Sequence, residues 1–229
     1  MEKLIIVGLG INAKNAYEFI KRHNLYDVIG FAVNKEYKTI NSFYNLPVYS
    51  LETIKQDLNN TNFKIFISVF WNHLNADRKK IYEYCKNEAF EFANLISPTA
   101  ILSGKIKGEN CWINDYAIIK NGALIESNTF VMEYALVGTN THISSNCFLA
   151  ARSTVAGECT VGEQSFIGLS ATVLDATHIG KKCIIGACAM VKRNIPDFSR
   201  CNISFENVII KQYDECTIEE KLVSSKNIR

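Results

Sequence analysis

The sequence lacks the cysteine and histidine spacing of a metal site or a disulfide framework. Its eight cysteines include no C-x-x-C pair, and the closest two, Cys183 and Cys188, have no His pair near them at ligand spacing. Zinc sites and small disulfide-stapled domains both depend on such spacing. We therefore expect no bound metal, and we look for another reason for the cysteines.

An excess of charge and a long apolar run are absent as well. The formal net charge is only +2, and acidic and basic residues are scattered without a block of one sign. Such a pattern gives no footprint for nucleic acid or an anionic membrane. The N-terminal run "LIIVGLGI" is too short to span a bilayer and is not followed by a small-residue cleavage site. It predicts a buried strand in a cytoplasmic protein with no nucleic-acid or membrane partner.

The pattern of hydrophobic residues along the sequence changes near residue 92. The composition, 48% hydrophobic and 11% aromatic, is sufficient for a sizeable core. Over residues 1–92, strand-like and helix-like segments alternate, which is typical of a small α/β unit with a parallel sheet. The segments are "KLIIVG", "NAKNAYEFIKRH", "DVIGFAV", "SLETIKQDL", "KIFISVF" and "NADRKKIYEYCK".

From Leu95 onward the helical period gives way to a period of six. Every sixth residue is aliphatic apart from Lys107. These positions are Leu95, Ile101, Lys107, Ile113, Ile119, Ile125, Val131, Val137, Ile143, Leu149, Val155, Val161, Ile167, Val173, Ile179, Ile185 and Val191. A parallel β-helix produces this pattern, because three short strands per coil each point one aliphatic side chain inward. We expect it over residues 93–197.

A second set of positions in the same repeat is always small. Four residues after each aliphatic position the sequence has Cys111, Ala117, Ala123, Thr129, Ala135, Thr141, Cys147, Ser153, Cys159, Ser165, Ala171, Thr177, Cys183 and Ala189. Tight corners of the coil admit only small side chains there. Four of the cysteines are thereby explained as inert corner residues of about alanine size.

The residue before each inward position should point outward, because neighbours in a strand alternate. One face of the β-helix then carries an apolar ladder, Phe130, Phe148, Phe166 and Ile184. An exposed ladder of this kind would be an anomalous patch, so we expect it to be buried in a trimer interface. Another face carries His142 and His178, which lie two coils apart and are too distant to share a metal ion.

The segment "GLGINA", Gly8 to Ala13, matches a G-x-G-x-x-A fingerprint between a strand and a helix. Binding of NAD also requires an acidic residue at the end of the second strand, where this chain has Asn34. The second half of a doubly wound sheet is missing too, which argues against a redox role. Backbone N–H groups at a helix N-terminus suit any phosphate, so a phosphate-containing ligand remains the expectation.

From "IIVGLGINAK" to Asp197 the sequence resembles the left-handed β-helix acyltransferases with hexapeptide repeats. Within them it is similar to the sialic acid O-acetyltransferase group and the N-acetyltransferases of nucleotide-linked amino sugars. The resemblance implies a Rossmann-like α/β subdomain over 1–92, a left-handed parallel β-helix over 93–197 and a C-terminal cap or tail over 198–229. It also implies a homotrimer that transfers an acyl group, usually acetyl from acetyl-CoA, to a sugar amine or hydroxyl in surface glycan biosynthesis.

The resemblance also implies a set of site residues. In the family, the loop at Asn12 and Ala13 and the strand end at Asn34 hold the nucleotide of the sugar donor. Asn72 and Arg78 could add polar contacts to that cleft, or could simply cap a helix and face solvent. Acetyl-CoA would be flanked by Phe148, Gly157, Leu169 and Ala187. Its phosphates could meet Lys192 and the neighbouring Lys181, Lys182 and Arg193, which could equally be solubilising charges.

The general base is where this sequence departs from the family. The family places a His followed by an acidic residue where this chain has Thr139 and Asn140. His142, or His178, could supply a base from a shifted position, and a substrate that is already deprotonated could do without one. A non-catalytic nucleotide-sugar-binding or scaffolding relative is the alternative. His23 and His73 are expected to be surface residues without partners.

Overall fold

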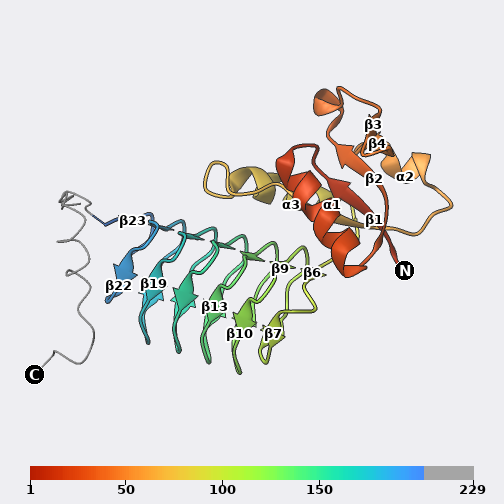
Figure 1. Ribbon diagram of the computed structural model, residues 1–229. Helices are drawn as coiled ribbons and strands as arrows, with labels where there is room; N and C mark the ends of the chain where they lie inside the picture. Colours follow the sequence, from red (N-terminus) through yellow and green to blue (C-terminus); the bar gives the residue numbers. More distant parts are fainter. Residues whose placement is uncertain (204–229) are drawn as a thin grey trace, which may run out of the picture.

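The computed structural model describes residues 1–203, in which an α/β subdomain is followed by a parallel β-helix (Figure 1). The predicted C-terminal cap lies, from residue 204 on, outside the described residues. Among the helices of residues 1–203, none has both the length and the apolar character required to cross a membrane.

The α/β subdomain follows the predicted alternation of strands and helices. Its elements are β1 (Lys3–Val7), α1 (Ile11–His23), β2 (Asp27–Val33), η1 (Lys35–Tyr37), β3 (Ser42–Phe43), β4 (Leu46–Ser50), α2 (Ile54–Asp57), β5 (Lys64–Ile67) and α3 (Ala76–Asn87). The sheet order is β3-β4-β2-β1-β5, parallel except for the β3–β4 pair. Two details differ from the prediction. Helix α2 is only one turn long, and the β3–β4 hairpin was not expected.

The two faces of this sheet pack against different partners. Leu4 and Ile6 of β1 face α1 and, beyond it, aromatic residues of the β-helix. Ile5 and Val7 face the other way, against α2 and α3. The continuous apolar run of β1 is therefore buried on both faces, as is typical of a parallel strand in the middle of a sheet.

The β-helix has three parallel sheets, and each complete coil contributes one two-residue strand to every sheet. We name them by their outward side chains. The aromatic sheet has β6 (Leu95–Ile96), β9 (Trp112–Ile113), β12 (Phe130–Val131), β15 (Phe148–Leu149), β18 (Phe166–Ile167), β21 (Ile184–Ile185) and β23 (Arg200–Cys201). The aliphatic sheet has β7 (Ile101–Leu102), β10 (Ile118–Ile119), β13 (Leu136–Val137), β16 (Thr154–Val155), β19 (Thr172–Val173) and β22 (Met190–Val191). The histidine sheet has β8 (Lys105–Ile106), β11 (Leu124–Ile125), β14 (His142–Ile143), β17 (Thr160–Val161) and β20 (His178–Ile179).

The predicted lattice is confirmed from Ile113 to Val191. Every inward aliphatic residue in this range is buried, and so is every small corner residue from Cys111 to Ala189. The first coil is out of phase with the prediction. Ile96 pairs with Ile113, Leu102 with Ile119 and Ile106 with Ile125, so these three are in register with the inward positions. Ile96 and Ile106 pack against the β-helix core, whereas Leu102 is 41% exposed.

The shift of the first coil corrects the assignment of Leu95, Ile101 and Lys107. Leu95 is buried outside the β-helix core, among the residues that face the α/β subdomain, whereas Ile101 and Lys107 are exposed. The shift also removes the one polar exception in the repeat. Lys107 stands after the inward residue rather than in its place.

The corners of the coils combine a left-handed residue with a buried small one. The residue before each small corner residue has positive φ, between 52° and 64° at the non-glycine positions, and glycine occupies this position only at Gly122. Gly138 and Gly162 serve a different purpose. A Cβ added to Gly138 would lie 2.3 Å from the carbonyl carbon of Ala156, and one added to Gly162 would lie 2.5 Å from that of Gly180. Glycine is required at these places because successive coils approach too closely for a side chain.

The α/β subdomain of the same chain buries Phe130 and Phe148 of the apolar ladder, which corrects the expectation that these two lie in a trimer interface. Phe66 and Phe70 contact Trp112 and Phe130 with ring centroids 5.6 to 5.8 Å apart. Phe130 and Phe148 are at most 2% exposed, whereas Phe166 and Ile184, farther along the ladder, are half-buried. The pattern analysis placed the ladder outside the β-helix correctly, but it missed the cover that the chain itself provides.

Candidate functional site

Gly8, the first residue of the fingerprint segment, lines a cavity at the carboxyl ends of β1, β2 and β5. Gly8 has φ of 130°, and a Cβ there would lie 2.7 Å from Ser68 Oγ, so the turn needs glycine. Helix α1 begins three residues later with no acidic residue in its first turn. Such a helix end favours an anion, because its first N–H groups lack intrahelical acceptors. The cavity has a volume of about 410 Å³ and is lined by Val7, Gly8, Val33, Asn34, Tyr37, Val69, Asp77, Lys80 and Ile81.

Of the four predicted substrate residues, only Asn34 lines this cavity. Asn12 is half-buried in the first turn of α1. Ala13 is buried, and its N–H donates to the Gly10 carbonyl. Asn72 is exposed in the loop after β5 and lines none of the cavities described here.

The acid that was missing from the end of β2 is supplied by another segment. Glu52, which follows β4, accepts from the Lys35 N–H at 2.9 Å and from the Asn34 side-chain amide at 3.5 Å, and Ser50 Oγ donates to it as well. Burial acts to raise the pKa of Glu52, but these hydrogen bonds outweigh it and hold that pKa below its usual value. A carboxylate therefore does stand beside the strand end, although most of its hydrogen-bonding capacity is already used.

Arg78 does not reach the cavity, which rules out the contact that we considered for it. Its guanidinium is fully buried at the subdomain junction and donates to the carbonyls of Val69, Asn128 and Cys147 at 3.1 to 3.3 Å. It also lies 4.0 Å above the ring of Phe130. Burial lowers the pKa of Arg78 to about 9. Its function is structural, since it ties α3 to two coils of the β-helix.

An apolar groove runs along the corner that follows the aromatic sheet. It has a volume of about 420 Å³ and is lined by Phe70, Trp71, Met132, Glu133, Phe148, Ala150, Ala151, Phe166, Gly168, Leu169 and Ala187. The loop after β5 supplies one wall and the β-helix supplies the other. The ring centroids of Trp71 and Phe148, one from each wall, are 5.0 Å apart. Three of the five predicted cofactor residues, Phe148, Leu169 and Ala187, lie here.

The other predicted residues lie elsewhere. Thr139 and Gly157 line a separate hollow of about 520 Å³ on the corner between the aliphatic and histidine sheets. The Gly157 N–H there donates to Asp175 Oδ1 at 2.8 Å. Lys192 is exposed on the last coil and lines neither hollow. The structure thus divides the predicted acyl-CoA residues between two edges of the β-helix that share no lining residue.

His142 forms a pair that the sequence analysis missed. Its Nε2 lies 2.9 Å from Glu126 Oε1, on the preceding coil. Glu126 Oε2 accepts from both the N–H and the Oγ of Ser145, each at 3.1 Å. Burial alone would raise the pKa of Glu126, but the hydrogen bonds from His142 and Ser145 outweigh it and lower that pKa. A carboxylate fixed in this way orients the imidazole that it contacts.

The pair is half-buried on the histidine sheet, beside a small hollow of about 160 Å³ lined by Lys107, Gly108, Glu126, Ser127 and Ser145. Thr139, three residues earlier, is absent from that lining and faces the other hollow. His178 contacts Thr160 rather than a carboxylate. The structure therefore does not bring the two predicted catalytic residues, His142 and Thr139, into one cavity.

The remaining histidines also have partners, contrary to the prediction. Nε2 of His23, at the end of α1, lies 2.8 Å from Asp115 Oδ1 on the β-helix, and the His23 side chain is only 11% exposed. His73 lies 2.9 Å from Asp77. Burial acts to raise the pKa of Asp115, but the hydrogen bond from Ser97 and the charges of His23 and Arg22 lower it on balance. Neither histidine lines a cavity described here.

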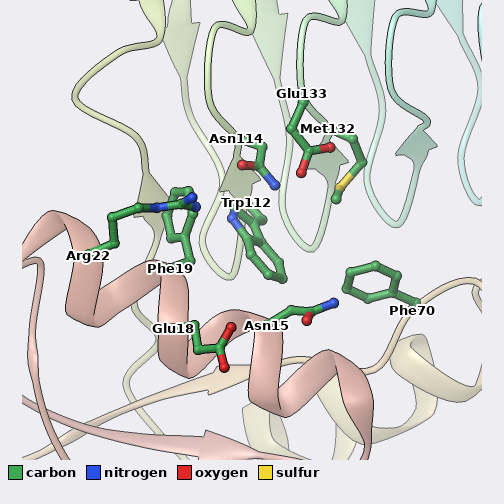
Figure 2. A pocket seen from close by; sticks show the side chains of 9 residues that line it. All are labelled: Asn15, Glu18, Phe19, Arg22, Phe70, Trp112, Asn114, Met132 and Glu133. Carbon is green, nitrogen blue, oxygen red and sulfur yellow. The ribbon is translucent and has the colours of Figure 1, made fainter.

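A polar pocket lies between α1 and the β-helix (Figure 2). It has a volume of about 520 Å³ and is lined by Asn15, Glu18, Phe19, Arg22, Phe70, Trp112, Asn114, Met132 and Glu133. Three of these residues, Phe70, Met132 and Glu133, also line the apolar groove. The polar pocket and the groove are therefore adjacent, and no motif in the sequence pointed to the pocket.

The buried cysteines fit their predicted role as small corner residues. Burial raises the pKa of the Cys111 and Cys147 thiols to about 12, so both are protonated at neutral pH and unreactive. Within residues 1–203 no three His, Cys, Asp or Glu side chains are grouped in a way that could hold a metal ion.

Comparison with known proteins identifies the fold. No protein-family model matches the sequence, and no curated protein matches it significantly. Solved structures do match. A His-to-Asn mutant of perosamine N-acetyltransferase from Caulobacter crescentus, in complex with CoA and GDP-perosamine, superposes with a TM-score of 0.78 at 23% identity, covering 89% of this chain and 94% of that one.

Two further structures give the same result. The acetyltransferase domain of PglB from Neisseria gonorrhoeae FA1090, in complex with acetyl coenzyme A, matches with a TM-score of 0.76 at 23% identity over 88% of this chain and 96% of that one. WeeI from Acinetobacter baumannii AYE matches with a TM-score of 0.72 at 14% identity over 86% and 94%. The predicted architecture, an α/β subdomain followed by a left-handed β-helix, is confirmed.

Proposed function

We propose that this protein is an acyl-CoA-dependent acyltransferase that modifies an amino or hydroxyl group of a nucleotide-linked sugar in surface glycan biosynthesis. One observation carries the proposal. Three consecutive residues after β5 line different hollows, with Val69 at the α/β cavity, Phe70 at both the polar pocket and the groove, and Trp71 at the groove. The α/β cavity and the apolar groove therefore meet at one loop.

The α/β cavity is the proposed nucleotide site. The N-terminus of α1, including the Asn12 N–H, would face the diphosphate, and Asn34 with Glu52 would bind hydroxyl groups of the nucleoside. Ala13 would contribute only by packing behind the Gly8 turn, and Asn72 would contact a ligand that extends past the loop. Nucleotide sugars are made in the cytoplasm, which is the location we propose for this protein.

The apolar groove is the proposed site of the pantetheine arm of acetyl-CoA. Phe148, Leu169 and Ala187 line it at successive coils, so an extended chain would run parallel to the axis of the β-helix. Its phosphates would approach Lys192 and its basic neighbours on the last coils. Two structures of the same fold were solved with CoA or acetyl-CoA bound, which supports this assignment.

His142, oriented by Glu126, is the proposed proton acceptor. In the reaction the acceptor nitrogen or oxygen forms a bond to the thioester carbonyl carbon, its proton passes to His142, and the carbon–sulfur bond breaks. The thiolate then leaves and takes up a proton to give free CoA. Within one chain His142 does not line the groove, so the proposal includes a homotrimer in which another copy completes the site. The hollow that contains Thr139 and Gly157 lies on the other side of the aliphatic sheet from the groove, and we propose that it belongs to the same shared site.

The assignment is tested by incubating the protein with acetyl-CoA and a panel of GDP- and UDP-linked amino and hydroxy sugars while free thiol is measured. We expect thiol release with at least one acceptor, a loss of 100-fold or more in kcat for His142→Ala and a smaller loss for Glu126→Gln (removal of a general base costs about 10²–10⁴-fold). Full activity of His142→Ala would exclude it as the base. A monomer at working concentration would exclude the shared site.

One observation favours a second candidate, a nucleotide-sugar-binding protein without catalysis. Thr139 stands where the resembled enzymes place a base, and no histidine of residues 1–203 lines its hollow. Tight binding of a nucleotide sugar by calorimetry, together with no thiol release from any acceptor, would establish this candidate in place of the enzyme.

A further inference from the structure

The polar pocket between α1 and the β-helix has an aromatic floor and an acidic rim. Its floor is made of Phe19, Phe70 and Trp112, and its rim carries Glu18 from α1 and Glu133 from the β-helix. In Figure 2 the indole of Trp112 stands between the α1 side chains and those of the coils, and Phe70 closes the far end. Aromatic faces beside carboxylates form a site that attracts an organic cation.

The cation among the pocket residues is already paired. Arg22 lies 3.1 Å from Asp115, which also contacts His23, and its guanidinium lies over the ring of Phe19. Glu18 has only Lys14 nearby, at 3.8 Å and on an exposed helix surface. Glu133 forms no ion pair with any residue from 1 to 203. Glu133 therefore brings to the pocket a negative charge that no ion pair among residues 1–203 compensates.

A buried donor gives an independent sign of a ligand. Trp112 is only 2% exposed, and its indole N–H has no acceptor among the described residues. A buried donor without a partner costs about 1–3 kcal/mol. Because Trp112 lines the pocket, an oxygen of a bound molecule is the natural acceptor for it. The ligand should then combine a cationic group with hydroxyl or ring oxygens.

We propose that this pocket binds the acceptor sugar by its ammonium group, and that Glu18 and Glu133 select an amino sugar over its hydroxy counterpart. This inference rests on the proposed function and narrows its acceptor to amines. Glu133 also lines the apolar groove, so an ammonium held by it lies at the border of the proposed acyl-CoA site. The sugar oxygens would accept the Trp112 N–H and the ring would pack on the aromatic floor.

The first test needs no catalysis. The sequence has two tryptophans, so in a Trp71→Phe protein the emission of Trp112 reports on the pocket. We expect glucosamine to produce a saturable change in this emission and glucose to produce none at the same concentration. Adding Glu133→Gln should weaken the glucosamine response at least tenfold, and Glu18→Gln should weaken it less. Glu91→Gln, which changes an exposed carboxylate elsewhere, is the matched control.

The outcomes separate this inference from the proposed function. Equal responses to glucosamine and glucose, no response to either, or an unchanged response in Glu133→Gln would each overturn the ammonium pocket. If thiol release with nucleotide sugars persists in that case, the acyltransferase proposal stands. If glucosamine binds selectively but no acceptor releases thiol, the pocket stands and the acyltransferase proposal fails. Thermal unfolding of Glu133→Gln confirms that the half-buried substitution leaves the fold intact.

Discussion

The interior of the β-helix and the junction between the two subdomains are built on opposite rules. The interior repeats one aliphatic and one small residue per strand from Ile113 to Val191, and none of these residues lines a cavity described above. The junction repeats nothing. It joins Phe66, Phe70, Trp112 and Phe130 with a buried guanidinium, and the groove and the polar pocket border it. Regularity here supports the structure, and departures from regularity provide the surfaces that we propose for binding.

Phe130→Ala is the substitution expected to have the largest effect, because it removes the central ring of the junction. The Phe130 ring is fully buried and makes four aromatic contacts, and replacing a core Phe with Ala costs about 3–5 kcal/mol. Urea unfolding measures it, with Phe198→Ala, which is 68% exposed, as the control. A midpoint shift that depends strongly on protein concentration would instead place Phe130 in an interface between copies.

Gly138→Ala tests the other side of the comparison, the close stacking of coils. Its Cβ would meet the Ala156 backbone at 2.3 Å, which cannot move without shifting a coil, so we expect a loss of about 1–3 kcal/mol in the free energy of unfolding. Gly10→Ala is the counterpart in the α/β subdomain, where nothing lies within 4 Å of the added Cβ. If both variants unfold at the same urea concentration as the unmodified protein, the stacking argument is wrong.

Ile106→Ala and Lys107→Ala test where the repeat begins. Ile106 packs against the β-helix core and Lys107 is exposed, so the first should cost about 1–2 kcal/mol, below the range for fully buried Ile→Ala, and the second almost nothing. Thermal unfolding of the two variants side by side measures the difference. The opposite ranking would restore the unbroken period of six through Lys107.

Glu163→Gln should have the smallest effect and should appear only in the pH dependence of stability. Glu163 accepts from Lys79 of α3 at 2.7 Å and from Asn146 at 2.9 Å, and the hydrogen bond from Lys79 leads in lowering its pKa. The unfolded chain therefore takes up this proton first as the pH falls. Above pH 4.5, the ordinary pKa, the Lys79–Glu163 pair stabilises the fold by about 0.5 kcal/mol, as is usual for an exposed pair. This stabilisation is lost as the pH falls through the lower pKa of Glu163 in the folded state. The free energy of unfolding is measured by urea titration at several pH values below 7. If it falls with pH equally in the variant and the unmodified protein, the ion pair contributes nothing.

The repeat made the β-helix predictable, because inward and corner positions are fixed by spacing alone. The same arithmetic could have found Glu126. One coil is 18 residues, so Glu126 lies beside Ser144 of the next coil, within reach of both His142 and Ser145. The first coil was misread because Lys107 was accepted as an exception, whereas a change in spacing places Ile106 inside.

The junction could not be derived in this way, because its contacts join residues far apart in the sequence without a common period. The repeat placed Phe130 in the outward apolar ladder but gave it no partner, Phe70 carried no signal of its own, and Arg78 was expected to face solvent or a ligand. What covers the ladder depends on how the α/β subdomain docks, which no local pattern encodes. The polar pocket went unnoticed for the same reason, since α1 and two coils contribute to it.

Arg78 has a consequence for how the chain can be divided. The sequence changes pattern near residue 92, which suggests a boundary for dividing the chain there. However, two of the three carbonyls that accept from the Arg78 guanidinium, those of Asn128 and Cys147, lie beyond that boundary. Separating the parts would expose the aromatic ladder and leave those carbonyls without their donor. The two halves should therefore melt in a single transition, and neither is an exchangeable module from which a new enzyme could be assembled by fusion.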